Sequence, residues 1–163
     1  MAHKPANLER GSPAIPILLL TLAAWLLAVP PATAAADDEV CFAVIVHSEN
    51  PVEAVDSKEM SRIMTRKMRR WPDETQIVPI DQPPQAETRR SFSKEVLGRS
   101  VSAIEAFWQR QIFSGRAVPP EQRKGDAEVI ATVSATPGAI GYVGCRSLPA
   151  EGVRTVEVTR EGP

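Results

Sequence analysis

The sequence predicts a layered α/β domain with a mainly parallel sheet flanked by helices. Apolar segments of strand length alternate along the chain with segments of helical periodicity, and this alternation is typical of such domains. The first strand segment, residues 40–46, is continuously apolar and rich in β-branched residues, which indicates a strand covered on both faces. The length of 163 residues suits one domain preceded by a targeting segment.

The first half of the domain is predicted to run strand, helix, strand. After the first strand the chain turns at residues 48–51, and Asp56 with Glu59 three positions later is a capping-box pattern that begins a helix. That helix would bury residues that recur at helical spacing: Met60, Ile63 and Met64. The helical region is expected to close at the Trp-Pro-Asp segment, because proline restricts the residue before it. Residues 77–80 form the next strand.

The second half is predicted to contain three helices and two strands. A helix beginning near residue 85 should end at Gly98, and Ser100 and Asp126 can cap two more helices on either side of a loop over residues 115–124. The strands are expected over residues 138–143 and 153–158. Four aromatic residues are expected to pack in the core rather than to form a stacking platform: Trp71, Phe92, Phe107 and Trp108.

Residues 1–34 are expected to be a signal peptide. Lys4 and Arg10 precede an apolar run over residues 14–29, and the sequence Ala-Thr-Ala at 32–34 is a small-x-small pattern that signal peptidase accepts. The apolar run is shorter than the ~20 residues that a membrane-crossing helix needs, which disfavours the alternative of an uncleaved anchor. The chain would therefore meet the membrane only through its signal peptide.

The mature domain is then expected to span residues 35–163, with a core over about 40–158, and to be periplasmic or secreted. The chain carries 19 Lys and Arg against 20 Asp and Glu, a balance that gives no field to attract nucleic acid. After loss of His3, the remaining His47 and two cysteines cannot make a four-ligand zinc site. Because no nucleophile elbow or phosphate loop is present either, we expect no metal, cofactor or catalysis.

Five short motifs follow one another along residues 42–145. They are the Asn-Pro turn within residues 44–52, the helical segment 59–67, Trp-Pro-Asp at 71–73, Phe-Trp followed by Phe-Ser-Gly within 107–115, and Pro-Gly-Ala-Ile-Gly-Tyr-Val at 137–143. Together they resemble the phosphate-type solute-binding proteins that serve ABC importers. The resemblance implies one lobe of a type II periplasmic-binding-protein-like fold, whereas full members close two lobes over an anion.

The resemblance also implies a ligand site at the loop and first helical turn after the second strand. Asp81 stands where the family has an arginine, and Glu87 lies in the neighbourhood of its Ser-Gly-Thr, so like charge is expected to repel phosphate. Asp81, Thr88 and Arg89 are nevertheless the candidate ligand-binding residues. The alternative is a solvated turn with ordinary capping, because acidic residues are common in a first helical turn.

Two further candidates and one charged segment lie outside that loop. Ser48 and Asn50 follow the first strand, on the side where α/β sheets bind ligands, although formation of a turn explains them equally well. The basic run within residues 58–70 could contact a lipid, a polymer or a partner, but a solvated helix face explains it better.

The resemblance therefore predicts binding without catalysis. The bound species would be a small ligand, including an anionic solute, or an envelope partner such as an ABC permease. The alternative is a structural or interaction module of the cell envelope that has lost ligand binding.

Cys41 and Cys145 are predicted to form a disulfide. They are the only two cysteines, and an exported chain meets oxidising conditions. Both lie at strand ends, so the bridge requires an antiparallel pair or a strand that returns past the first one, and the resemblance supports such a return. The alternative is two separately buried thiols.

Overall fold

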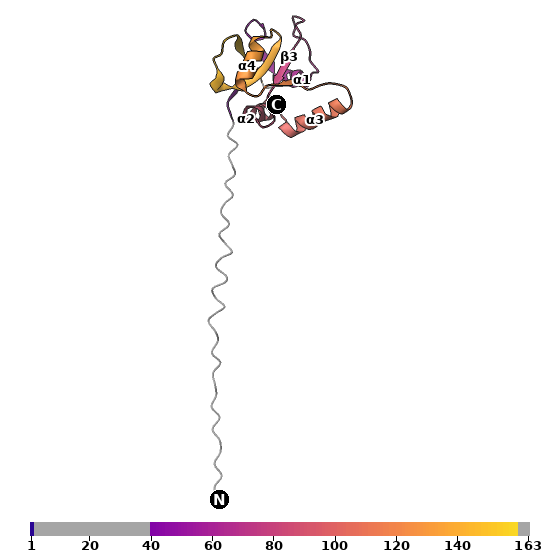
Figure 1. Ribbon diagram of the computed structural model, residues 1–163, viewed down its shortest axis with the longest axis vertical. Helices are drawn as coiled ribbons and strands as arrows, with labels where there is room; N and C mark the ends of the chain where they lie inside the picture. The colour runs from indigo at the N-terminus through magenta and orange to yellow at the C-terminus, as the bar shows by residue number, and fades with distance from the viewer. Residues whose placement is uncertain (2–39, 160–163) are drawn as a thin grey trace. The chain divides into compact units, whose positions relative to one another are not determined.

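The structure is a computed structural model that describes Met1 and residues 40–159 (Figure 1). Residues 2–34 of the expected signal peptide lie outside the described part. The elements follow in the order β1 (Phe42–His47), β2 (Ala54–Asp56), α1 (Ser57–Met64), β3 (Val78–Asp81), α2 (Glu87–Glu95), α3 (Val101–Phe113), β4 (Glu121–Gln122), α4 (Asp126–Ser134), β5 (Ala139–Gly144), the 3-10 helix η1 (Cys145–Ser147) and β6 (Val153–Thr159). Within the described residues, no helix has the length and apolar character that crossing a membrane requires.

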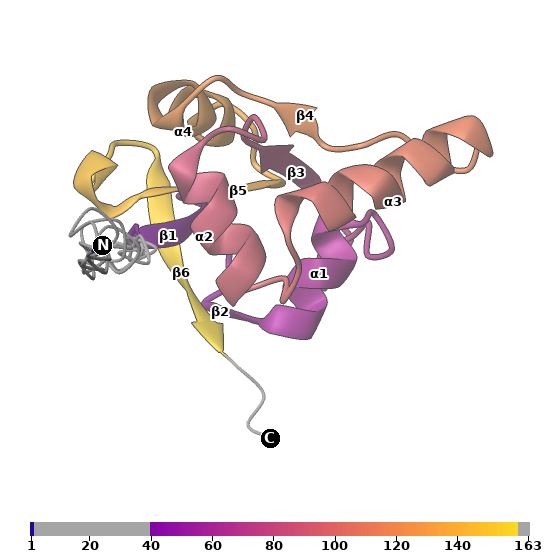
Figure 2. The ribbon, with the colours of Figure 1, turned by 90° about the horizontal axis from the view of Figure 1, so that it is seen from below.

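The six strands form one sheet in the order β2-β6-β1-β5-β3-β4. β3 is parallel to β4 and β5, and β2 is parallel to β6. β1 lies inside the sheet and runs antiparallel to both of its neighbours, β5 and β6 (Figure 2). The predicted α/β domain with a mainly parallel sheet is therefore confirmed, with β1 as the one strand that opposes the common direction.

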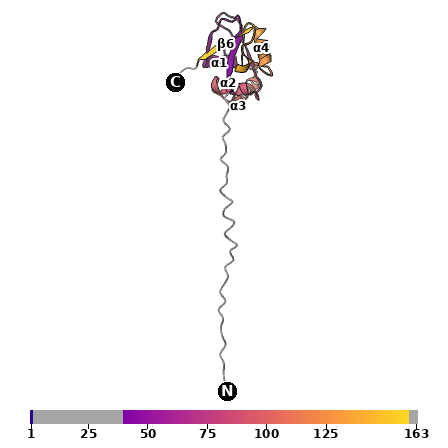
Figure 3. The same ribbon diagram turned by 90° about the vertical axis from the view of Figure 1, so that its left-hand side faces the viewer.

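Residues 42–46 of β1 are all apolar because helices cover both faces of the sheet. Val44 and Val46 belong to the core cluster that includes buried residues of α1 and α2. Ile45 points to the other face and packs in a second cluster with Val129 and Val133 of α4. Figure 3 shows α4 and α1 on opposite sides of the strands. The interpretation of residues 40–46 as a strand buried on both faces is thus confirmed.

The start of α1 agrees with the sequence pattern, but its end does not. The Glu59 amide donates to Asp56 Oδ1 at 2.6 Å and the Asp56 amide donates to Glu59 Oε2 at 3.3 Å, which completes the capping box. The helix ends at Met64, before the Trp-Pro-Asp segment, so that predicted boundary is wrong. Arg66 takes φ 55°, and the two following amides donate to the Arg62 carbonyl. This left-handed helix ending normally favours glycine.

In the second half of the domain, some elements agree with the sequence prediction and others differ from it. Ser100 caps α3 by accepting from the Ala103 amide at 3.2 Å. Only Ile104 and Trp108 of α3 are buried, and its C-terminal half extends away from the sheet, so Ile112 is exposed (Figure 2). Of the four aromatic residues expected in the core, three are buried and Phe107 is half-buried. The strands β2 and β4 are three and two residues long, too short to show periodicity in the sequence.

A disulfide joins Cys41 to Cys145, whose Cα atoms are 5.5 Å apart across a sequence separation of 104. Phe42 of β1 lies opposite Gly144 of β5, so the residue before one strand faces the residue after the other. The Cys145 amide also donates to the Cys41 carbonyl at 3.0 Å. The antiparallel pair that the predicted bridge requires is therefore present, and neither cysteine of the described chain is free.

Candidate functional site

The carboxyl ends of β3 and β5 meet at one edge of the sheet, which we call the carboxyl edge. β3 ends at Asp81 and β5 ends at Gly144, and the two strands are parallel neighbours. Hydrogen bonds connect these ends to Arg89 in α2 and to Asp126 in α4. Open α/β sheets bind ligands outside the carboxyl ends of their strands, so this edge is the candidate site.

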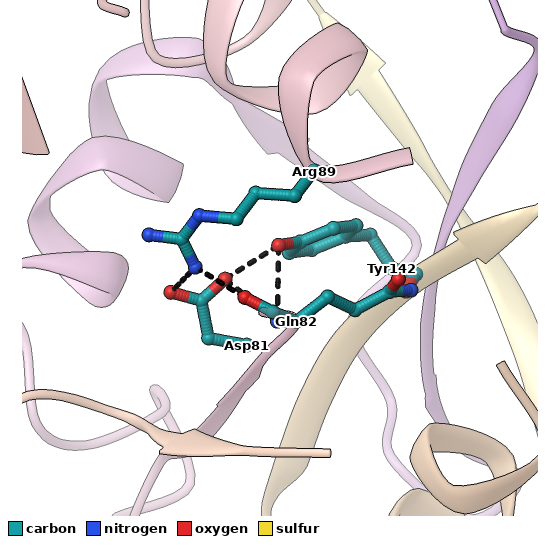
Figure 4. Close-up of polar contacts among 4 residues, drawn as sticks. All are labelled: Asp81, Gln82, Arg89 and Tyr142. Atoms are coloured by element: carbon teal, nitrogen blue, oxygen red, sulfur yellow. Dashed lines mark hydrogen bonds and ion pairs between the residues drawn. The ribbon is translucent and has the colours of Figure 1, made fainter. Parts of the chain in front are cut away.

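A buried ion pair occupies the centre of the carboxyl edge. The Arg89 guanidinium binds the Asp81 carboxylate, and their side chains are only 3% and 6% exposed (Figure 4). Asp81 Oδ1 also accepts from the Gln82 amide at 2.8 Å and from the Tyr142 hydroxyl at 2.5 Å. Arg89 additionally donates to the Gln82 carbonyl at 2.7 Å, while its Nε is buried with no partner in the described chain. The charge of Asp81 is therefore neutralised inside the lobe.

Tyr142 places its hydroxyl at this ion pair from β5. Its ring stacks on Phe92 of α2 with centroids 3.9 Å apart, which fixes the ring against the helix. Burial raises the pKa of the Tyr142 phenol well above its ordinary value, and the neighbouring Asp81 carboxylate raises the pKa further, while Arg89 opposes both effects. The phenol therefore stays protonated and donates to Asp81 across the physiological pH range.

A second group of hydrogen bonds joins the carboxyl edge to α4. The Gln82 side-chain amide donates to Asp126 Oδ1 and to the Tyr142 carbonyl, both at 2.9 Å. Asp126 Oδ2 accepts from the Gly144 amide at 2.9 Å and from the Ser147 hydroxyl at 2.6 Å. Asp126 is the first residue of α4 and Gly125 is its N-cap, so the predicted capping role of Asp126 is wrong. Its carboxylate instead binds the end of β5.

The candidate Thr88 also lies at the carboxyl edge. A Cβ atom at Gly144 would lie 3.9 Å from Thr88 Oγ1 and 3.1 Å from Asp126 Oδ2, so the hydroxyl and the carboxylate both approach this glycine. Thr88 is partly exposed, whereas Asp81 and Arg89 are buried. Of these three candidates, Thr88 presents the more accessible polar side chain, and Glu87 beside it is exposed in the first turn of α2.

Ser48 and Asn50 lie at the other end of the sheet. They follow β1, and because β1 is antiparallel to β5 its carboxyl end lies beside the amino end of β5, with Val46 opposite Ile140. Asn50 is buried, its Oδ1 accepts from the Val52 amide at 3.0 Å, and its carbonyl accepts from Arg154 Nε at 2.9 Å. These contacts form a turn. The expectation that both residues share a side of the sheet with the ligand site is therefore wrong.

A family model described as the PBP superfamily domain matches residues 40–161. The chain belongs to this superfamily. A comparison with curated protein sequences finds no significant match. Family membership agrees with the resemblance read from the motifs, and it covers the whole of the domain that the structure describes.

Solved structures similar to this PBP-superfamily lobe include receptors for phosphate. A phosphate ABC transporter substrate-binding protein from Clostridium perfringens, described with bound phosphate, has a TM-score of 0.58 and 23% identity over 73% of this chain and 45% of that one. An ABC-type phosphate transport receptor from Vibrio cholerae gives 0.57 and 16%, over 73% and 46%. PstS from Borrelia burgdorferi gives 0.53 and 18%, over 76% and 49%. At these identities the likeness shows the fold, and the chain spans about half the length of each structure.

The site of this PBP-superfamily lobe is only partly visible in the sequence. Asp81, Thr88 and Arg89 are brought to one edge, but the sequence does not predict Gln82 and Tyr142 as part of the site, and it predicts Asp126 only as a helix cap. The available signal was Tyr142 within an apolar strand segment, because a buried tyrosine hydroxyl needs an acceptor. No cluster of metal-ligating side chains occurs among the described residues.

Replacing Tyr142 by phenylalanine is expected to lower the free energy of unfolding by about 1.5–3 kcal/mol, the usual range for a hydrogen bond to a charged group. The raised pKa of Tyr142 also predicts the pH dependence. The folded state holds the Tyr142 proton more tightly than the unfolded state does. The contribution of Tyr142 to the free energy of unfolding is therefore fully present below about pH 10 and falls above it, as the tyrosine of the unfolded chain ionises. The Phe variant should lose less stability over that alkaline range.

Tyr142 is the single tyrosine of the chain, so tyrosinate absorbance reports on this residue alone. In the native protein the absorbance should appear only together with unfolding, as followed by circular dichroism. Tyrosinate formation near pH 10 in the folded protein would contradict the buried, protonated state.

Proposed function

We propose that the chain is an exported, non-catalytic binding protein of the cell envelope. Residues 35–163 would form a single PBP-type lobe and residues 1–34 its signal peptide. Membership of a superfamily of binding proteins supports the binding role. The Cys41–Cys145 disulfide supports export, because such bonds persist in oxidising compartments.

The observation that carries the finer proposal is the buried pair of Arg89 and Asp81. An oxyanion at the carboxyl edge would have to take Arg89 away from Asp81, and an unpaired buried carboxylate costs about 3–5 kcal/mol. An oxyanion that bound beside the pair instead would meet the charge of Glu87. We therefore propose that this lobe binds a small ligand other than free phosphate, or an envelope partner such as an ABC permease.

A second candidate function is an interaction module without a small ligand. The exposed apolar end of α3 favours it, because Phe113 is 90% exposed and Ile112 and Val118 are also accessible. Large apolar residues exposed at the end of a helix, such as Ile112 and Phe113, can serve as contacts with other proteins. Failure of every common oxyanion to raise the melting temperature of the protein would favour this candidate.

Calorimetry with phosphate tests the proposal directly. We expect no dissociation constant below about 1 mM, which corresponds to about −4 kcal/mol. The Asp81→Asn variant is the matched comparison, because it removes one negative charge and keeps the shape of the side chain. It should bind phosphate more tightly than the native protein does. Micromolar affinity in the native protein would overturn the proposal.

A further inference from the structure

A cavity of about 220 Å³ lies beside the amino end of β3, away from the residues of the carboxyl edge. Its polar lining comes from Arg66, Arg69 and Gln76, all in the segment that joins α1 to β3. Its apolar lining consists of Met68, Ile77, Pro79 and residues 117–118 of the segment after α3. No aspartate or glutamate lines it. The cavity lining therefore combines two arginines with apolar residues.

Two features make an arginine at position 66 energetically unfavourable. Its φ of 55° is in the left-handed region, where a glycine would avoid steric strain. Its Nε is buried and has no hydrogen-bond partner in the described part of the chain. A buried donor without a partner is destabilising, so an acceptor at this position would remove the cost. Both features are local costs of placing an arginine at this position.

The two arginines that line the cavity, Arg66 and Arg69, belong to a basic segment of the chain. Residues 58–70 contain six cations: Lys58, Arg62, Arg66, Lys67, Arg69 and Arg70. Within the range that the structure describes, only Arg70 has a carboxylate within ion-pair distance, Glu74 at 3.8 Å. Arg69 Nε donates to the Arg66 carbonyl at 3.2 Å, which ties the two lining arginines together. The cavity thus lies within a basic segment whose charge is available to an anion.

We propose that this cavity binds the carboxylate of a small organic acid. The planar guanidinium group matches a carboxylate, which can accept from the two arginines that line the cavity, Arg66 and Arg69. The apolar part of the acid would pack against Met68, Ile77 and Pro79, an interaction that inorganic phosphate cannot make. The inference does not depend on the carboxyl edge, because neither Asp81 nor Arg89 lines this cavity.

Titration of the purified, isotope-labelled protein with benzoate tests the proposal. Saturable shifts are expected at the Arg66 and Arg69 side-chain Nε–H signals and at the Ile77 amide. Benzylamine and benzyl alcohol have the same ring without the negative charge and should leave these signals unchanged. Equal responses to benzoate and benzylamine, or a stronger response of the same signals to phosphate than to benzoate, would overturn the assignment.

Three variants separate this site from general charge effects and from loss of folding. Arg66→Gln should weaken benzoate binding by about tenfold or more, the loss expected for a charge-assisted hydrogen bond. Arg62→Gln removes the same charge from an exposed neighbour that does not line the cavity, and should change affinity less than twofold. Arg66→Gly suits the left-handed backbone, so it should melt at a higher temperature and still lose binding. Equal weakening by Arg62→Gln and Arg66→Gln would reject the site.

Discussion

Replacing Arg89 by methionine is expected to lower the free energy of unfolding by about 3–5 kcal/mol, because it leaves the buried Asp81 carboxylate without its counter-ion. The two side chains are almost fully buried, so water cannot take the place of the guanidinium. Denaturant unfolding followed by circular dichroism measures the loss. The same substitution leaves the Tyr142 and Gln82 hydrogen bonds to Asp81 in place. It also removes the Arg89 hydrogen bond to the Gln82 carbonyl, so the measured loss reports on the ion pair and that bond together.

The neighbouring Arg90 provides the matched control. Arg90 pairs with Glu87 at 3.6 Å, but both side chains are largely exposed, and Arg90→Met should cost no more than about 0.5 kcal/mol. The double variant Asp81→Asn/Arg89→Met should be more stable than Arg89→Met alone, since it no longer buries an unpaired charge. Equal losses in the free energy of unfolding for Arg89→Met and Arg90→Met would show that the buried ion pair stabilises the lobe no more than the exposed one does.

Removing the disulfide is expected to have the other large effect. Opening a loop with a sequence separation of 104 should destabilise the lobe by about 4–5 kcal/mol in the chain-entropy model. The variant Cys41→Ser/Cys145→Ser and the reduced native protein should therefore unfold at similarly lowered denaturant concentrations. Agreement between the two would separate loss of the bond from the effect of the substituted side chains.

Mass spectrometry of the protein recovered from its host decides whether the bond forms there. Alkylation without reduction should leave both cysteines unmodified. Two alkylated cysteines in the native protein would contradict the bridge and the stabilisation expected from it.

Local patterns predicted the parts of the fold that depend on neighbours in sequence. Asp56 and Glu59 cap α1, and Ser100 caps α3, because capping needs only a side chain and an amide a few residues away. The glycine of the Pro-Gly-Ala motif, in contrast, has a tertiary steric basis. A Cβ atom at Gly138 would lie 2.0 Å from the Gln76 carbonyl oxygen, so a larger residue cannot occupy this turn.

The direction of β1 could not be predicted in this way. A continuous apolar segment shows that both faces are covered but carries no information on which neighbours the strand has. An assumption that β1 runs parallel to its neighbours places Ser48 and Asn50 at the wrong end of the sheet. Likewise, Asp81 and Arg89 could be named as candidates separately, but their pairing depends on how α2 docks on the strands. That docking is a tertiary property of Phe92 and Tyr142.

The position of β1 has a consequence for how the chain acquires its structure during synthesis. The strand is among the first segments of the domain to leave the ribosome, yet its hydrogen-bonding neighbours are β5 and β6, the last two strands. The centre of the sheet therefore cannot assemble until nearly all of the domain is available, and pairings of such high contact order form slowly. An unassembled chain can be threaded through a narrow translocation channel, whereas a folded lobe cannot. The same topology delays the meeting of Cys41 with Cys145 until the last part of the domain has followed the first.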